Sequence, residues 1–175
     1  MVITVKRITT PITDEMVNSL EVGDMVYVSG YIFTGRDAVL PKIVNDMEAG
    51  KLGEKGIDLT GGVVFHTAVS PAGTGPTSSN KLEIEASIEP LSKGGIKMHL
   101  GKGQLKPETI AALDKYNSLY ALIPPVTALL ESKVSSREVM AYPEEGMEAF
   151  HRLYVTDFPC VIAAVRGKSI YDKEA

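Results

Sequence analysis

Three basic residues of this 175-residue sequence lie in glycine-containing segments whose composition favours binding of an anion. Arg36 follows Gly35, Lys102 lies between two glycines, and Lys81 ends the run 73–81, which has no large apolar side chain. Glycine and hydroxyl residues let such a run bend tightly and point several backbone N–H groups at one ligand. The run is therefore either a solvated turn, which its composition also fits, or part of an anion site with the other basic residues.

Each basic segment comes after a stretch that is typical of a β-strand. Residues 25–34 and 62–69 are rich in Val, Ile, Tyr and Phe, and residues 96–100 alternate apolar with polar side chains. In folds where strands alternate with helices, the loops at one edge of the sheet carry the ligand site. We therefore expect the segments of Arg36, Lys81 and Lys102 to gather at one edge of an α/β sheet.

Arg36 also precedes a predicted helix. The apolar residues that follow it recur at helical spacing and form one face, made of Leu40, Ile43, Val44 and Met47. Asp37 is the expected N-cap of this helix and Gly50 its C-cap. Arg36 would then lie just outside a helix N-terminus, where the N–H groups and the macrodipole favour an anion. The alternative is that Arg36 only pairs with Asp37 or Glu48.

The remaining pattern predicts a single α/β domain covering residues 1–175. Further strands are expected at 119–123, 134–142, 154–155 and 161–165, and further helices at 107–117 and 126–131. Residues 82–89 favour short helical pieces that Pro90 ends, and Gly30 is expected to mark a bulge or a close backbone approach. Residues 1–20, with a short strand and a helical turn after Thr13, are expected to form an N-terminal extension that packs on the domain.

The composition argues against several functional classes. The chain has 18 Lys and Arg against 22 Asp and Glu, and its formal net charge of −4 speaks against a nucleic acid partner. Because the sequence shows no apolar run typical of a signal peptide or a membrane span, we expect a soluble, cytoplasmic protein. Cys160 is the one cysteine, whereas an iron–sulfur cluster takes about four thiolate ligands. His66, His99 and His151 lie too far apart for a local metal motif, so no metal site is predicted.

From about Leu20 to Gly167, the chain resembles the beta subunit, or C-terminal domain, of class I iron–sulfur fumarases and of the related L-tartrate dehydratases. The resemblance depends on the order and spacing of short motifs, since each motif is weak alone. The motifs are Gly23-Asp24, Thr34-Gly35-Arg36-Asp37, Gly75-Pro76-Thr77-Ser78, Gly101-Lys102-Gly103, Gly146-Met147-Glu148-Ala149 and Asp157-Phe158-Pro159.

The resemblance implies a swivelling β/β/α domain that closes over a fumarase-type alpha subunit, with the active site between the two chains of a hetero-oligomer. The implied reaction is the reversible hydration of fumarate to malate, and the implied four-iron four-sulfur cluster, a Lewis acid for the hydroxyl, is carried by the alpha subunit. A dianionic substrate needs cations for the carboxylate that the cluster does not bind, and the elimination needs a base for the C3 proton.

The resemblance also implies roles for individual residues. Arg36 would bind a substrate carboxylate through two hydrogen bonds, while Lys81 and Lys102 would each add a positive charge. Thr77 matches a threonine proposed as the catalytic base in the family. The same loop would supply two further substrate-binding residues, Ser78 and Gly75.

The sequence departs from the family pattern at several positions. Ala38-Val39-Leu40 stands where the family usually has Ala-Ala-His, Ser78 and Lys81 stand where it has threonine and arginine, and Arg166 stands where it has an aspartate before the last glycine. These departures keep two alternatives to fumarate hydration open. One is dehydration of L-tartrate or another hydroxy acid, and the other is a non-catalytic anion-binding or assembly module of the same fold.

Overall fold

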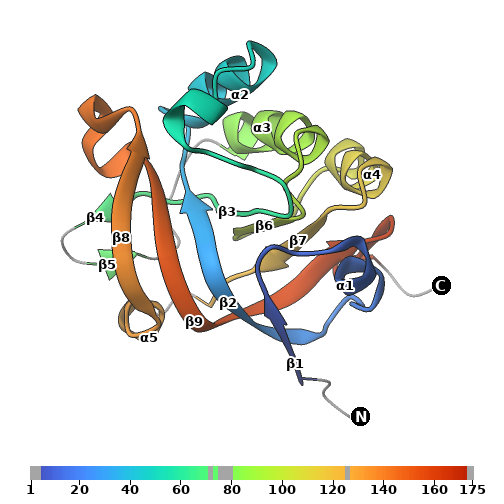
Figure 1. Cartoon of the computed structure of the whole chain (residues 1–175). Helices are drawn as coiled ribbons and strands as arrows, with labels where there is room; N and C mark the ends of the chain where they lie inside the picture. Colours follow the sequence, from blue (N-terminus) through green and yellow to red (C-terminus); the bar gives the residue numbers. More distant parts are fainter. Residues whose placement is uncertain (1–4, 71–72, 75–80, 125–126, 173–175) are drawn as a thin grey trace.

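The computed structural model describes residues 5–70, 73–74, 81–124 and 127–172. A ring of strand pairings closes the central sheet into a small barrel (Figure 1). In order around the ring, the strands are β2 (Met25–Thr34), β3 (Val63–Phe65), β6 (Met98–Gly101), β7 (Leu119–Leu122) and β9 (Phe150–Val165). The first four run parallel to their neighbours, and β9 closes the ring by pairing antiparallel with both β2 and β7.

Shorter strands extend this ring. β1 (Val5–Thr9) pairs in parallel with β2, while β8 (Val134–Ala141) and β10 (Lys168–Ser169) pair antiparallel with β9. β4 (Val69–Ser70) and β5 (Gly73–Thr74) form a separate two-stranded sheet. Residues 5–9 are therefore hydrogen-bonded to the main sheet through β2.

Apolar side chains fill the barrel because alternate residues along its strands point inward. This inner cluster includes Val26, Val28, Ile32, Val63, Phe65, Met98, Leu100, Leu119, Ala121, Leu153 and Ile162. Phe33 of β2 and Val64 of β3 belong to a second cluster on the outer face, with apolar residues of the helices. A strand that is covered on both faces has a nearly continuous apolar sequence, and β3 has such a sequence.

Helices α2 (Leu40–Glu48), α3 (Lys81–Lys93) and α4 (Pro107–Lys115) lie side by side along the outer face of the parallel strands (Figure 1). α1 (Asp14–Asn18) begins after Thr13, whose Oγ1 accepts a hydrogen bond from the N–H of Met16 at 3.2 Å, as the predicted helical turn requires. The other short elements are η1 (Gly53–Lys55), α5 (Thr127–Glu131) and η2 (Pro143–Glu148).

Helix α2 begins later than predicted. Its N-cap is Val39 and not Asp37, because the N–H groups of Val39 and Leu40 first bond to the carbonyl of Arg36, at 3.1 and 2.9 Å, and form a turn. A helix capped by Asp37 would need the N–H of Pro41 for its first hydrogen bond, and proline has none. Arg36 therefore lies one turn before the helix rather than directly at its N-terminus.

Two prolines lie inside a regular element, although the sequence pattern predicts a break at each of them. α3 continues through Pro90 to Lys93, because a proline in the last turn removes a single hydrogen bond from the helix. Pro159 lies inside β9, opposite Tyr27 of β2, so the two strands predicted at 154–155 and 161–165 are one strand. The irregularity is confined to a bulge nearby, where Asp157 has a φ of 50°.

Candidate functional site

The carboxyl ends of β2, β3 and β6 form one edge of the barrel, because these strands are parallel neighbours. Beyond the strands, the N–H of Gly35 donates to the last carbonyl of β3 at 3.2 Å, and the N–H of His66 donates to the carbonyl of Leu100 at 3.0 Å. His66 thus follows the middle strand. Arg36 follows the strand on one side of it, and Lys102 follows the strand on the other side.

Arg36 is held by a carboxylate that is distant in sequence. Its Nε donates to Oε1 of Glu148 at 3.3 Å, and the two side chains are 20% and 29% exposed. Glu148 ends η2, and η2 is tied to α2 by an ion pair between Lys42 and Glu145 at 2.6 Å. The segment Gly146-Met147-Glu148-Ala149 thus contributes to the edge by orienting a guanidinium.

Lys102 lies in the exposed turn that follows β6. Gly103 has a φ of +86°, which glycine adopts at little cost, and its carbonyl accepts a hydrogen bond from the hydroxyl of Tyr120 at 3.2 Å. Burial raises the pKa of Tyr120, so this phenol stays protonated and remains a donor. The turn that carries Lys102 is therefore anchored to β7.

The other predicted site residues fall in the segment between β5 and α3. Gly75, Thr77 and Ser78 lie outside the described residues, and so does the side chain of Lys81, although its backbone begins α3. α3 itself starts at the end of the segment that leaves the edge after β3. Convergence of this loop with Arg36 and Lys102 stays a prediction.

Two histidines that the sequence treated as isolated are hydrogen-bonded to each other. Nε2 of His66 lies 3.0 Å from Nδ1 of His99, and Nε2 of His99 lies 2.9 Å from Oγ of Ser92 on α3. All three side chains are buried. The signal was present in the sequence, because one histidine lies in the predicted strand 62–69 and the other lies in the predicted strand 96–100. Those strands were not assigned as neighbours.

Burial sets the protonation state of this pair. It lowers the pKa of His66 to about 4, and it lowers the pKa of His99 well below the usual value, with a further contribution from His66. Both rings are therefore neutral near pH 7. His151 does not belong to this pair. Its Nδ1–H donates a hydrogen bond to the carbonyl of Ala149 at 2.8 Å, next to the start of β9.

The described residues do not fit an iron–sulfur cluster. Cys160 is fully buried in β9, opposite Val26, and burial raises the pKa of its thiol to about 12, whereas cluster ligands are thiolates. Within the described ranges, no group of three or more His, Cys, Asp or Glu side chains could hold a metal ion. A cluster at this site would have to be bound by another polypeptide segment.

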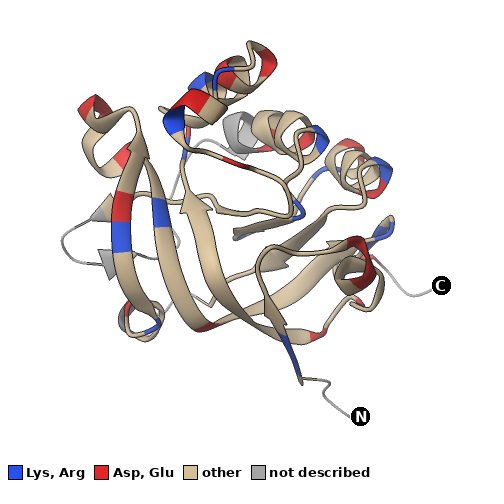
Figure 2. Ribbon diagram, in the orientation of Figure 1, with Lys and Arg blue, Asp and Glu red and all other residues tan. Residues whose placement is uncertain are grey.

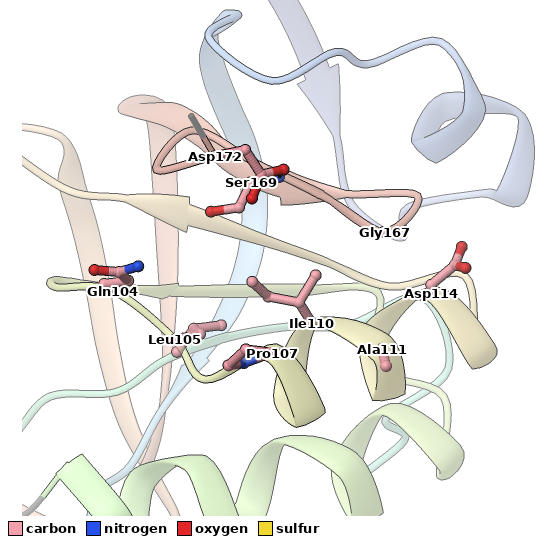
Figure 3. A pocket seen from close by; sticks show the side chains of 9 residues that line it. All are labelled: Gln104, Leu105, Pro107, Ile110, Ala111, Asp114, Gly167, Ser169 and Asp172. Atoms are coloured by element: carbon pink, nitrogen blue, oxygen red, sulfur yellow. Dashed lines mark hydrogen bonds between the residues drawn. The ribbon is translucent and has the colours of Figure 1, made fainter. Parts of the chain in front are cut away.

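A cavity of about 310 Å³ lies close to the anchored turn but has the wrong charge for a dianion. Figure 3 shows α4, with Ile110 and Asp114, on one side and the turn with Ser169 and Asp172 on the other. Its lining residues include two carboxylates and no Lys, Arg or His. This cavity is therefore not the predicted anion site.

Charges of both signs are interspersed on the helices and on β8 and β9 (Figure 2). An anion at the edge must therefore be attracted by the local arrangement of cations rather than by a broad positive surface. None of the helices in the part of the chain that the structure describes is both long and apolar enough to span a bilayer.

The fold and the edge together define a class, namely an α/β barrel domain with a candidate anion site at the carboxyl ends of its parallel strands. Comparison with known proteins gives the family. The model described as Fumarase C-terminus matches residues 2–174, so the chain belongs to that family.

Relatives in this family differ in how much of their length the chain covers. The chain is 30% identical over 176 residues to a Geobacillus stearothermophilus protein named "Putative fumarate hydratase class I", matching 93% of this chain and 32% of that protein. It is 27% identical over 171 residues to the L(+)-tartrate dehydratase subunit beta of Escherichia coli K12, matching 91% of this chain and 82% of that subunit. The chain thus spans about a third of the first relative and most of the second.

Proposed function

We propose that this chain is the beta-type half of a cytoplasmic hydro-lyase that interconverts fumarate and malate at a site shared with an alpha-type module. The observation that carries the proposal is the pattern of coverage among relatives. The same module makes up most of a protein named as a subunit beta and only a third of a protein named as a fumarate hydratase. The rest of the longer relative corresponds to what a partner would have to supply.

In this proposal, the barrel edge binds the substrate carboxylate that faces this chain. Arg36, oriented by Glu148, offers a planar guanidinium that matches a carboxylate, and Lys102 adds a positive charge from the turn after β6. Thr77 is the proposed base, and Gly75, Ser78 and Lys81 are proposed to complete the binding loop. The domain is proposed to swivel over its partner so that the edge closes on the substrate.

The four-iron four-sulfur cluster of the proposed enzyme belongs to the alpha-type module. The buried thiol of Cys160 supports this assignment, since it lies in the barrel wall and is kept protonated. When bound, such a cluster supplies a Lewis acid for the substrate hydroxyl. This chain contributes carboxylate binding and proton transfer.

Dehydration of L-tartrate is the second candidate. It is favoured by the match to most of a tartrate dehydratase beta subunit and by Lys81, which stands where the family pattern has arginine. Both reactions require the binding of a hydroxy-dicarboxylate. Tartrate differs from malate by its second hydroxyl group. Rates on the separate substrates distinguish them.

The test is reconstitution with an alpha subunit of the family under anaerobic conditions, followed by rate measurements on fumarate, L-malate and L-tartrate. Arg36→Lys keeps the charge but removes the bidentate geometry, so we expect kcat/KM to fall about a hundredfold. Arg137→Lys on β8 is the matched control and should leave the rates unchanged. Full activity of Arg36→Lys, or no turnover of any of the three acids by the wild-type complex, would contradict the proposal.

A further inference from the structure

His66 follows the middle one of the three strand ends that form the candidate anion site, although no motif drew attention to it. Its backbone follows β3, between the strand end that carries Arg36 and the strand end that carries Lys102. Its ring points away from the barrel interior toward α3, since its partner His99 in turn contacts Ser92 of that helix. The three side chains form a buried chain from α3 to the edge.

The hydrogen-bond direction along this chain can be assigned. In the described part of the protein, the buried hydroxyl of Ser92 is bonded to His99 alone, so its proton is directed at Nε2 of His99. A neutral imidazole has one N–H, and His99 must therefore carry it on Nδ1 and donate it to Nε2 of His66. His66 then carries its own proton on Nδ1.

This Nδ1–H is a buried donor with no acceptor among the described residues. Buried polar groups in proteins are almost always hydrogen-bonded, so an orphan donor in a structural position would be disfavoured. Nδ1 is bonded to Cγ, the ring carbon that carries Cβ, so it lies closer to the His66 backbone, and hence to the carboxyl end of β3, than Nε2 does. The chain from Ser92 prevents the ring from turning to satisfy it elsewhere.

We propose that His66 is a substrate-binding residue whose Nδ1–H donates a hydrogen bond to an oxygen atom of the bound dicarboxylate. The inference rests on the proposed function, because it takes the occupant of the edge to be an oxyacid. His99 and Ser92 are positioning residues that fix the tautomer and the direction of the ring. A neutral donor binds the oxygen without adding charge, and it complements the cations of Arg36 and Lys102.

The tautomer is tested first, in the isolated chain. Long-range ¹H–¹⁵N correlation spectra at pH 7 should show His66 with its proton on Nδ1 and His99 likewise. Ser92→Ala should mix the tautomers, while Ser87→Ala, a buried serine on the same helix outside the chain, should not. A proton on Nε2 of His66 in the wild-type protein would overturn the inference.

Ligand binding is tested second, with L-malate and L-tartrate added to the reconstituted complex. Saturating ligand should shift the Nδ1–H resonance of His66, whereas sodium chloride at equal ionic strength should not. His66→Leu should raise the KM about ten- to hundredfold, the loss expected for one charge-assisted hydrogen bond. His66→Asn, whose amide N–H₂ lies near the position of Nδ1, should restore more affinity than His66→Gln, whose amide lies near Nε2.

The outcomes separate this inference from the proposed function. Dicarboxylate binding that depends on Arg36 but leaves the His66 resonance unchanged would refute the role of His66 and leave the hydro-lyase assignment intact. Equal KM values for the Asn, Gln and Leu variants would refute it as well. Absence of any dicarboxylate binding by the wild-type complex would refute both.

Discussion

Glu148 matters to the site through geometry more than through stability. Its ion pair with Arg36 is partly exposed, and such pairs contribute about 0–1 kcal/mol to folding. A carboxylate on Nε nevertheless restricts the rotation of the guanidinium, so the direction of the fork is set before a ligand arrives. The pair joins residues 112 positions apart and links η2 to the barrel edge.

Replacing Glu148 by Gln is expected to impair substrate binding while sparing the fold. The amide cannot form the ion pair, so Arg36 becomes less well oriented and kcat/KM should fall about tenfold. Glu145→Gln is the matched control, since it removes an ion pair that the same η2 segment forms with Lys42. Equal kcat/KM values for the two variants in steady-state assays would show that Glu148 has no positioning role.

At this scale, the sequence predicted single residues better than pairs. Arg36 and Lys102 were predicted to share an edge because each lies beside glycine at the end of a strand-like stretch, and both do follow parallel neighbours at one edge of the barrel, while their binding role stays a prediction. The contact between His66 and His99 was missed because it depends on which strands are neighbours. Local residue patterns do not contain that information.

Gly30 is the position in β2 where the backbone depends most on the absence of a side chain. It has a φ of +113°, the register between β2 and β9 shifts beside it, and an added Cβ would collide with Oγ1 of Thr10. The predicted bulge or close approach is confirmed at this glycine. It lets Thr10 pass close to β2 before the N–H of Ile12 bonds to the carbonyl of Gly61 at 2.7 Å.

Gly30→Ala is expected to lower the free energy of unfolding by about 3 kcal/mol, through backbone strain and the collision together. Gly50→Ala is the control, because Gly50 also has a positive φ, +71°, but has open space where the Cβ would lie. It should cost about 1 kcal/mol. Urea denaturation measures the free energy of unfolding of both variants. Equal losses would show that Thr10 moves aside without a cost in stability.

Elements were predicted well where periodicity was strong and poorly where proline was taken as a boundary. β2 has the predicted bounds, and α4 begins at Pro107 as expected. β9 was divided because Asp157-Phe158-Pro159 resembles a turn, yet the segment is tolerated by a bulge. Tertiary pairing with β2 overrides the local preference there, and a single sequence does not reveal that pairing.

The buried histidine pair makes the stability of the whole molecule depend on pH. In the unfolded chain, both rings have a pKa near 6.5, whereas in the folded protein that of His66 is about 4 and that of His99 is also lowered. Between these values the unfolded state binds protons that the folded state does not. Stability is therefore highest above pH 6.5 and falls as the pH drops toward 4.

We expect the free energy of unfolding to fall by about 1.4 kcal/mol per pH unit for each histidine across this window. Urea denaturation at several pH values between 7.5 and 4.5 measures the slope. The double variant His66→Leu/His99→Leu lacks both titrating groups. Its free energy of unfolding should therefore change less steeply with pH, by up to the contribution of both histidines. A wild-type stability that does not change between pH 6.5 and 5 would contradict the burial of neutral imidazoles.

Closure of the ring by β9 also decides when this domain can fold during synthesis. β2 ends before residue 35, yet one of its two edges pairs with residues 151–161, so that edge has no partner until the last third of the chain has left the ribosome. Such distant pairings are slow to form, and two-state domains that depend on them fold on timescales of roughly milliseconds to seconds. The nascent chain therefore carries an open strand edge for most of its translation, which exposes it to aggregation and to chaperones.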